Sequence, residues 1–427
     1  MIATFVVLLL FLLLMGGTPI GFALCLSGAF GLWWVAGTDV VLTTLANMPH
    51  ATGSAFEFLT IPMFLLMAEF VLRSGIADDL FRAAAAWVGR MPGGLGIATA
   101  FAGAGFGAIC GSSTASAATL SSTSLPTMLK HGYERPMAAG VVAISGTLAM
   151  LIPPSIAMVL FGLLANVSIA KLLVAGIVPG ILVTATIALT TWYLAKRDPR
   201  CAPLSEAVAW RQKFALLRLV LPMLALFTAV SVSIYTGFVT PTEASALGAL
   251  VAALLYFIRA RRTASEVYDI IARATRSSCM LAIIILGANI FSTFFTLTQT
   301  TQSITAWVGS LPVEPWVIIG LLVLMYLVLG CFMDQTAILV LTTPVIAPLV
   351  ESLGFSLIWW GVIKIVTAEL GLVVPPLGLN AFVVAKYSKI PVGEVFKGVT
   401  PHVVTHLIAI AILLLVPALS LWLPGRM

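Results

Sequence analysis

The sequence predicts an all-α integral membrane protein of roughly 10–12 membrane elements, arranged as an inverted tandem repeat with two re-entrant hairpins and two broken helices. Composition is the first reason: hydrophobic residues make up 60% of the 427 residues, charged residues only 9%, and the mean hydropathy is +1.11. The second reason is a pair of Pro-Pro steps, Pro153-Pro154 and Pro375-Pro376, inside long apolar stretches. The third is the uneven distribution of Lys and Arg along the chain. This composition leaves no room for a soluble catalytic domain.

Each Pro-Pro step predicts a break in a membrane helix. Proline has no N–H group and clashes with the preceding turn, so a helix cannot continue through it undisturbed. Because unpaired backbone groups are costly in lipid, such breaks persist only where protein or a polar cavity satisfies them. Breaks at corresponding positions of two halves are typical of a transporter's binding site.

The two halves correspond at a constant offset. Pro376 minus Pro154 is 222, and the same difference relates five further pairs of small or helix-breaking residues: Ala149 and Gly371, Pro126 and Pro348, Gly132 and Gly354, Gly176 and Gly398, and Pro179 and Pro401. This self-similarity predicts a tandem repeat. We therefore divide the chain into N-terminal scaffold helices at 1–56, a first repeat at 57–200, connecting scaffold helices at 201–277 and a second repeat at 278–427.

The first half is predicted from its apolar runs, its amphipathic stretch and its Gly-rich and Ser-rich stretches. No Lys or Arg occurs before Arg73, so Met1–Met15 lacks the basic start of a signal peptide and is expected to remain as a helix. The expected elements are helices at 2–15 and 19–36, an external loop at 39–55, a helix at 57–73, an amphipathic arm at 76–89, a re-entrant hairpin at 93–129, a broken helix at 136–165 and a returning helix at 172–195.

The second half repeats this order from the other side of the membrane. Helices near 218–238 and 243–258 join the halves, and the remaining elements are a helix at 278–298, an arm at 300–310, a hairpin at 313–350, a broken helix at 357–386 and a last helix at 402–423. The basic stretches 196–218, 259–276 and 386–397 are cytoplasmic by the positive-inside rule, whereas 299–315 has no Lys or Arg and is external. The two arms then lie at opposite surfaces, so the repeats are inverted.

The predicted hairpin tips carry the polar residues expected of a ligand site. In the first tip a Gly-rich run leads into Cys110–Ser116 and further hydroxyl side chains. Small residues also let membrane helices pack closely, but this explains the glycines better than the dense hydroxyl run. In the second tip Asp334 is either a cation ligand or a brace for the tip through backbone N–H groups, and we favour the brace.

The remaining charged residues in or near spans are interpreted as snorkelling or paired: Glu69, Glu243, Lys364 and Glu369. The four His residues lie at the ends of predicted spans. A helix that ends at a Pro-Pro step leaves carbonyl groups unpaired, and this negative end suits Na⁺. Half-helices that begin at the hairpin tips offer N–H groups, which suit a carboxylate. One hairpin and one break per half give two cation sites beside a shared anion site.

Five blocks of the sequence resemble the large membrane subunit of TRAP transporters, the DctM-like proteins: Cys110–Ala115, His131–Glu134, Ile152–Ile156, Phe332–Asp334 and Pro375–Asn380. The resemblance extends almost from end to end. It implies an elevator-type secondary transporter, similar to the ion transporter superfamily, that crosses a bacterial inner membrane many times and imports an organic acid, such as a C4-dicarboxylate, by sodium symport. It also implies two partners, a small four-helix membrane subunit (DctQ-like) and a periplasmic substrate-binding protein (DctP-like).

The same resemblance implies the residues of each site. The first sodium site would use Cys110, Ser112 and Ser113 with Ala149, Ile152 and Pro154; the second would use Gly330 and Asp334 with Gly371, Val374 and Leu377. The organic anion would be held near Ser112, Ser113, Thr114, Ser155 and Asn380. Three residues depart from the family pattern: Cys110 where Ser is frequent, Ala149 where Gly is usual and Val374 where Thr is usual. Carbonyl ligands survive such changes and side-chain ligands do not, so we expect the Val374 site to bind Na⁺ more weakly or through a water.

Two other functions use the same re-entrant hairpins. An ion channel could line a pore with their hydroxyl groups, although such pores usually come from symmetric subunits, whereas this chain repeats within itself. A proton-coupled organic anion transporter is the second alternative. An enzyme is disfavoured because Cys110, the best-placed thiol, has no His or Asp in its block, so no catalytic residues are predicted.

Overall fold

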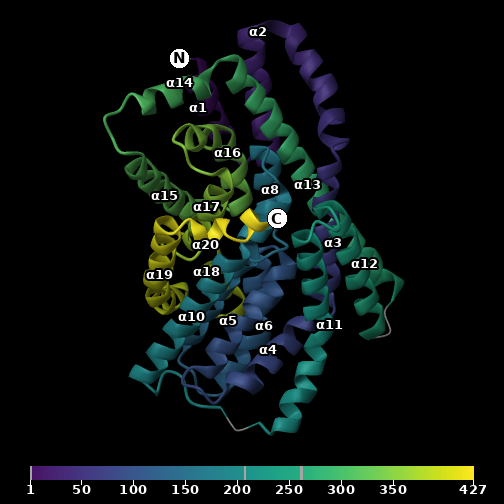
Figure 1. Cartoon of the computed structure of the whole chain (residues 1–427), viewed down its shortest axis with the longest axis vertical. Helices are drawn as coiled ribbons and strands as arrows, with labels where there is room; N and C mark the ends of the chain where they lie inside the picture. The colour runs from purple at the N-terminus through teal and green to yellow at the C-terminus, as the bar shows by residue number, and fades with distance from the viewer. Residues whose placement is uncertain (1, 206–207, 260–262) are drawn as a thin grey trace.

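The computed structural model describes residues 2–205, 208–259 and 263–427, and the regular structure within these ranges is entirely helical (Figure 1). The first half contains α1 Ile2–Met15, α2 Ile20–Gly53, the short 3-10 helix η1 Phe56–Leu59, α3 Thr60–Arg73, α4 Ile76–Val88, α5 Gly94–Cys110, α6 Ser113–Lys130, α7 Arg135–Gly146, η2 Thr147–Met150, α8 Ile156–Ala165, α9 Ile169–Ala175 and α10 Ile177–Arg197. The second contains α11 Trp210–Tyr235, α12 Pro241–Arg259, α13 Ala264–Leu297, α14 Thr300–Gly309, α15 Pro315–Phe332, α16 Gln335–Ser352, α17 Leu357–Gly371, α18 Leu379–Ser388, α19 Val392–Leu415, α20 Ala418–Leu421 and η3 Pro424–Arg426. Among the described helices, eight are long and apolar enough to cross a membrane.

The second half of α2 corrects the sequence prediction. The external loop expected at 39–55 is wrong, because α2 continues to Gly53 after a bend at Gly37, whose φ is 82°. Glycine adopts this left-handed conformation without a steric penalty, so one residue redirects the chain while helical hydrogen bonding resumes beyond it. The apolar run that follows the bend continues as a helix in spite of Pro49.

Several other helices begin earlier than the sequence predicted. The predicted starts at 218, 278 and 402 are wrong, since α11 begins at Trp210, α13 at Ala264 and α19 at Val392. Charged and polar residues at these positions favour connectors, whereas in the structure they form the first turns of long helices. For α13 the start is set by a capping box, in which Thr263 and Glu266 each bond the other's backbone N–H. The returning helix predicted at 172–195 corresponds to α9 and α10, which together form one candidate span over Ile169–Arg197.

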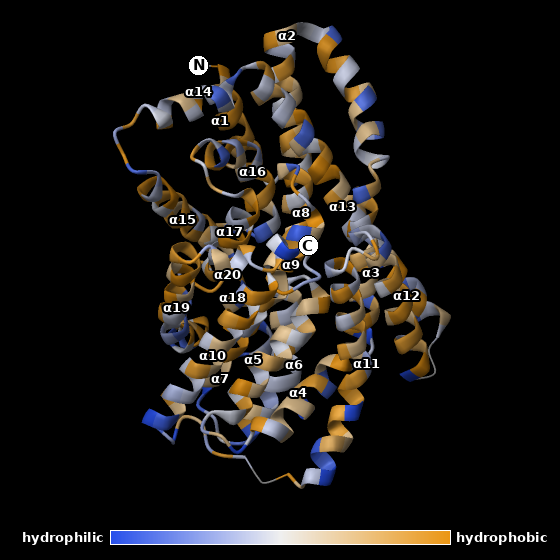
Figure 2. Cartoon of the chain, viewed as in Figure 1, coloured by the Kyte–Doolittle hydropathy of each residue, from blue (hydrophilic) through white to orange (hydrophobic). Residues whose placement is uncertain are grey.

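The tandem repeat is visible element by element. Subtracting 222 from the bounds of α16, Gln335–Ser352, gives 113–130, which are the bounds of α6. The two arms, α4 and α14, lie at opposite ends of the long axis of the molecule, each beside the hairpin of its own repeat (Figure 1). Related arms at opposite ends of the molecule are the arrangement expected of an inverted repeat. Hydrophilic residues gather at the lower end in Figure 2, where α10 ends and α11 begins.

The helices form two units, which we call the scaffold unit (α1–α3 and α11–α13) and the core unit (α5–α8, α10 and α15–α19). Within the scaffold unit α2 lies along α13, and α3 packs against α12 and α13. Within the core unit the repeats cross over, since α6 of the first hairpin packs against α18, and α16 of the second hairpin packs against α8. Each hairpin therefore contacts the broken helix of the other repeat as well as its own.

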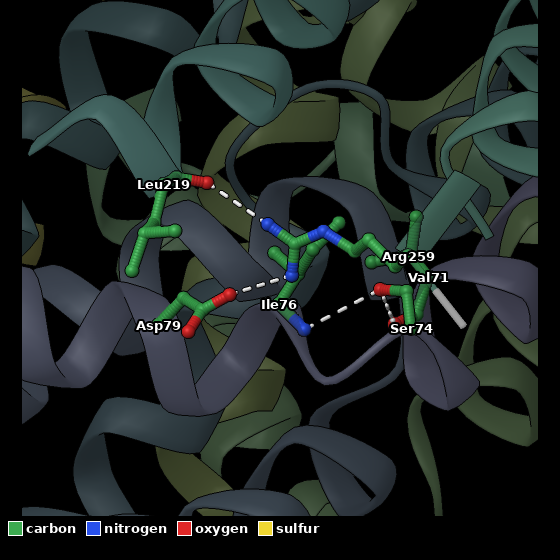
Figure 3. A network of polar contacts seen from close by, with 6 residues as sticks. All are labelled: Val71, Ser74, Ile76, Asp79, Leu219 and Arg259. Carbon is green, nitrogen blue, oxygen red and sulfur yellow. Dashed lines mark hydrogen bonds and ion pairs between the residues drawn. The ribbon is translucent and has the colours of Figure 1, made fainter. Parts of the chain in front are cut away.

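The arm α4 joins the two units and is fixed at its first turn (Figure 3). It follows α3 after a 65° bend at Ser74 and Gly75, and it packs between α5 of the core unit and α11 of the scaffold unit. Arg259, at the end of α12, binds the Asp79 carboxylate at 2.5 Å and donates to the Leu219 carbonyl at 2.9 Å. This is the one ion pair found among the described residues. The start of the arm is thus held by the scaffold unit.

Candidate ion and substrate site

The first break lies between α7 and α8. The helix tightens to the 3-10 turn η2, passes Pro153-Pro154 and resumes at Ile156. Ser155 caps the new helix, accepting the Met158 N–H at 3.3 Å and donating to the Met150 carbonyl. The carbonyl oxygens of Ala149, Ile152 and Pro154 accept no hydrogen bond from any residue that the structure describes. Three of the carbonyls implied for the first sodium site are therefore free to bind a cation.

The second break, between α17 and α18, has the same design. Both Pro-Pro peptide bonds are cis. The Val374 N–H donates to the Gly371 carbonyl at 3.1 Å, while the carbonyls of Val374 and Leu377 have no donor among the described residues. The Gly378 N–H reaches the Cys331 carbonyl at 3.4 Å, which ties this break to the end of α15 in the second hairpin.

At each hairpin tip one residue is the N-cap of the helix that follows. The Ser112 hydroxyl accepts the Ala115 N–H at 3.4 Å at the start of α6. The Asp334 carboxylate accepts the Thr336 and Ala337 N–H groups at 3.0 and 3.4 Å at the start of α16. The two caps are related by the repeat offset, since 334 minus 112 is 222. Asp334 thus has the bracing geometry that we favoured, and its role as a sodium ligand stays a prediction.

Glycines bring the hairpins against the breaks. A Cβ on Gly107 in α5 would lie 2.7 Å from the Ala149 Cα, and a Cβ on Gly330 in α15 would lie 2.5 Å from the Ala368 carbonyl oxygen and 2.9 Å from the Gly371 Cα. Real Cβ atoms do not approach other atoms so closely, so only glycine allows these contacts. In this way Gly330 and Gly371, both implied for the second sodium site, are brought together.

The two repeats are joined by a buried hydrogen bond that the sequence did not reveal. Ser113, at the first hairpin tip, donates to the Glu369 carboxylate on α17, and both side chains are 1% exposed. Of the two interpretations given to Glu369, snorkelling or paired, the structure shows the paired one, because the carboxylate is enclosed and bonded across the core unit. Its second carboxylate oxygen has no partner among the described residues.

Lys364, on the same helix, is also buried and does not snorkel. Its side chain is 0% exposed, and its Nζ donates to the Thr343 hydroxyl at 2.6 Å. The rings of Tyr326 and Phe161 lie with their centroids 5.1 and 5.4 Å from the amine. Lys364 therefore joins α17 to α15, α16 and α8.

The structure brings most of the predicted substrate residues to one region. Gly111, next to Ser112, approaches Ile156, which follows Ser155. The Thr114 hydroxyl lies 3.4 Å from that of Ser112. Asn380 is on α18, which packs against α6, and both atoms of its fully buried amide lack partners among the described residues.

One further candidate site residue, Gln335, could have been identified from the repeat offset. Gln335 stands 222 positions after Ser113, is 1% exposed, and has an amide with no partner in the described part of the chain. Sequence reasoning passed over it because Gln carries no charge and belongs to no recognised block. Gln335 is therefore the equivalent, at the second hairpin tip, of Ser113 at the first tip, where Ser113 bonds Glu369.

Two connected crevices separate the scaffold and core units away from the hairpin tips. One, of about 700 Å³, lies between the α8–α9 connection, η1, the end of α2, the start of α12 and the C-terminal part of α13; the other, of about 540 Å³, lies among α8, α13, α14 and α16. They share Leu164, Asn166 and Ser292. Neither is lined by Ser112, Ser155 or the other predicted substrate residues.

The histidines of α19 correct another expectation. His402 and His406 do not lie at a span end, because α19 begins at Val392 and places both within its length. They are 0% and 2% exposed, and no described residue bonds their ring nitrogens.

The fold is that of a membrane protein in which each of two hairpins packs against the broken helix of the other repeat. Comparison with known proteins identifies the family: residues 7–419 match the model for the DctM component of tripartite ATP-independent periplasmic transporters, and the chain belongs to this family. It is thus a large permease subunit of the TRAP type.

Relatives support this assignment across the whole chain. The C4-dicarboxylate TRAP transporter large permease protein DctM of Pseudomonas aeruginosa is 35% identical over 404 residues, 94% of each chain. The isethionate TRAP transporter permease protein DctMQ of Oleidesulfovibrio alaskensis is 30% identical over 97% of this chain and 65% of that protein. The crystal structure of the YdaH transporter of Alcanivorax borkumensis shares the fold, with a TM-score of 0.64 and 17% identity over 90% and 89% of the two chains.

Proposed function

We propose that this permease imports an organic acid anion by sodium symport, as the large subunit of a tripartite transporter in a bacterial inner membrane. The observation that carries the proposal is the set of unpaired carbonyl oxygens at both Pro-Pro breaks, each beside a hairpin tip. Carbonyl oxygens at the negative end of a half-helix suit a hard cation. Two such ends in one core unit support two sodium sites.

The residues present fit the two sodium sites to different degrees. At the first break the carbonyls of Ala149, Ile152 and Pro154 have no donor in the described chain, and Ser112 and Ser113 can add hydroxyl oxygens. At the second break Val374 and Leu377 offer carbonyls alone, and the Asp334 carboxylate implied for this site already accepts the Thr336 and Ala337 N–H groups. We therefore propose that the first site binds Na⁺ more tightly than the second.

The anion is proposed to bind between the two tips. The starts of α6 and α8 lie close together, since Gly111 approaches Ile156, and their positive helix ends favour a carboxylate, whereas the first N–H groups of α16 are already bound by the Asp334 carboxylate. The unpartnered amide of Asn380 can donate to a carboxylate oxygen, which would remove the cost of burying an unsatisfied polar group. An organic acid, with a C4-dicarboxylate as the first compound to test, fits these donors and the names of the relatives.

The partners and the motion are proposed from family membership and the two units. A small DctQ-like membrane subunit would pack on the scaffold unit, and a periplasmic DctP-like protein would deliver the acid. The arm α4 is held by Arg259 of the scaffold unit and packs against α5 of the core unit, which suits a hinge between a fixed scaffold and a travelling core.

The test is uptake of a labelled C4-dicarboxylate into proteoliposomes that contain this permease with its small subunit and binding protein. We expect uptake to require an inward Na⁺ gradient and to stop when K⁺ replaces Na⁺, even with a proton gradient imposed. Uptake driven by the proton gradient alone would show that transport is coupled to protons and not to sodium. Flux that neither saturates nor depends on the binding protein would indicate a channel.

In the same assay Pro376→Ala tests the second break. Alanine can continue the helix, so the freed carbonyls are expected to re-enter helical hydrogen bonds and the apparent Na⁺ affinity to fall. Binding of the periplasmic protein should be unchanged. An unaltered Na⁺ dependence would contradict the assignment of the second site.

A further inference from the structure

An exposed cluster of aromatic and basic side chains lies where the arm α4 ends and α11 begins. Trp87 meets Trp210 and Phe214 edge to face, with ring centroids 6.1 and 5.8 Å apart. The three side chains are 41%, 67% and 59% exposed. The Lys213 amine sits 5.7 Å from the ring centre of Trp87 and 4.9 Å from that of Trp210. We call these four residues the Trp87 cluster.

The cluster lies at the edge of an apolar surface. Beyond Phe214, α11 exposes Leu221 and Leu224, which are 53% and 44% exposed, and the whole helix is apolar enough to cross a membrane. Before Trp210 the chain is a polar connector. Exposed tryptophans at such a boundary are typical of the membrane–water interface, where the ring is buried among lipid chains and the N–H meets headgroups.

The charge around the cluster is strongly positive. Residues 196–218 contain six basic side chains and two acidic ones, Asp198 and Glu206, so their net charge is +4: the basic residues are Lys196, Arg197, Arg200, Arg211, Lys213 and Arg218. Arg90 follows Trp87 by three residues and is also exposed. By the positive-inside rule this surface faces the cytoplasm, whose membrane leaflet carries anionic lipid.

We infer that the Trp87 cluster is a binding site for an anionic phospholipid headgroup of the cytoplasmic leaflet. Lys213 and the neighbouring arginines would pair with the phosphate, while the three rings pack against the glycerol and the upper acyl chains. Since Trp87 is on the arm and the other three residues are on α11, the lipid would hold the end of the arm beside the scaffold unit. Arg259 holds the start of the arm, so both ends would be fixed.

The test is binding of phosphatidylglycerol to the purified full-length permease in phosphatidylcholine micelles, measured by native mass spectrometry. Lys213→Gln should weaken binding about fivefold, the fold-change that corresponds to the roughly 1 kcal/mol expected per basic residue near an anionic surface. Trp210→Leu should weaken it as well, because it removes the interfacial ring and keeps an apolar side chain. The effect of Lys213→Gln should shrink as salt is raised.

Lys397→Gln is the matched control. Lys397 is exposed and lines a surface hollow with Arg197 and Asp198 of the same connector, and no aromatic ring contacts its amine in the described part of the chain. The control loses the same charge from the same surface, so it should change binding much less. Thermal unfolding in pure phosphatidylcholine shows whether each variant is folded.

Equal losses in Lys213→Gln and Lys397→Gln would overturn the proposal, because they would show a diffuse electrostatic effect instead of a site. Competition by inorganic phosphate at the concentration of the lipid would also overturn it, in favour of a free-anion site. Unchanged lipid binding combined with loss of small-subunit copurification would identify the cluster as a protein interface.

Discussion

Substituting Gly330 by Ala tests whether the second hairpin must touch the second break. The added methyl group would lie 2.5 Å from the Ala368 carbonyl oxygen and 2.9 Å from the Gly371 Cα. Both are backbone atoms, so no side-chain rotation can relieve the contact. Overpacking of this kind costs about 1–3 kcal/mol. We expect the hairpin to shift away from α17, with a lower unfolding temperature and a disrupted second cation site.

The same helix supplies the control. Gly320 in α15 has no atom within 4 Å of the position that a Cβ would occupy. Gly320→Ala adds the same methyl group to the same helix, and alanine is the better helix former by about 0.5–1 kcal/mol. Its unfolding temperature should therefore stay equal or rise, and transport should persist.

The assays are thermal unfolding in detergent with Na⁺ or with K⁺, and sodium-driven uptake in proteoliposomes. A ligand that binds only the folded protein raises its stability with concentration. Wild type and Gly320→Ala should show this Na⁺-dependent rise, and Gly330→Ala should show a weaker one together with slower uptake. If Gly330→Ala matched Gly320→Ala in both assays, the close contact between α15 and α17 would be unnecessary and our account of the site would fail.

Two further predictions concern contacts between helices. Glu369→Leu leaves the Ser113 hydroxyl buried without its acceptor, so the free energy of unfolding should fall by about 1–3 kcal/mol. Glu369→Gln keeps an acceptor and should cost less. Equal destabilisation of the two variants in denaturant or heat would contradict the hydrogen bond. Arg259→Met removes the partly exposed pair with Asp79, so stability should fall by no more than about 1 kcal/mol while the initial rate of uptake drops; an unchanged rate would show that anchoring the arm is dispensable.

The helices and the repeat could be predicted largely from the sequence. Proline chemistry located both breaks, and the offset of 222 is reproduced by the bounds of α6 and α16. Predictions failed mainly at helix starts. The capping box at Thr263 and the bend at Gly37 depend on local geometry, and neither changes the apolar pattern from which spans are read.

The candidate site could be predicted only in part. The sequence indicated the tips and breaks because Gly, Ser and Pro stand out within apolar runs. It left Lys364 and Glu369 open between snorkelling and paired, since a charged residue in a span gives no sign of whether it faces lipid, water or another helix. Only packing shows that Lys364 is enclosed by aromatic rings and that Glu369 meets Ser113.

The sequence by itself determined the membrane class, the inverted repeat and the positions of the two breaks, because apolar length, charge bias and proline sterics act over a few residues. The tertiary structure alone decided which elements of the two repeats pack together: α6 against α18 and α16 against α8. It also decided that Ser113 bonds a carboxylate 256 positions away. Such contacts depend on how whole helices pack. Glycines such as Gly330 permit that packing, but a glycine in the sequence does not show which helix will pack against it.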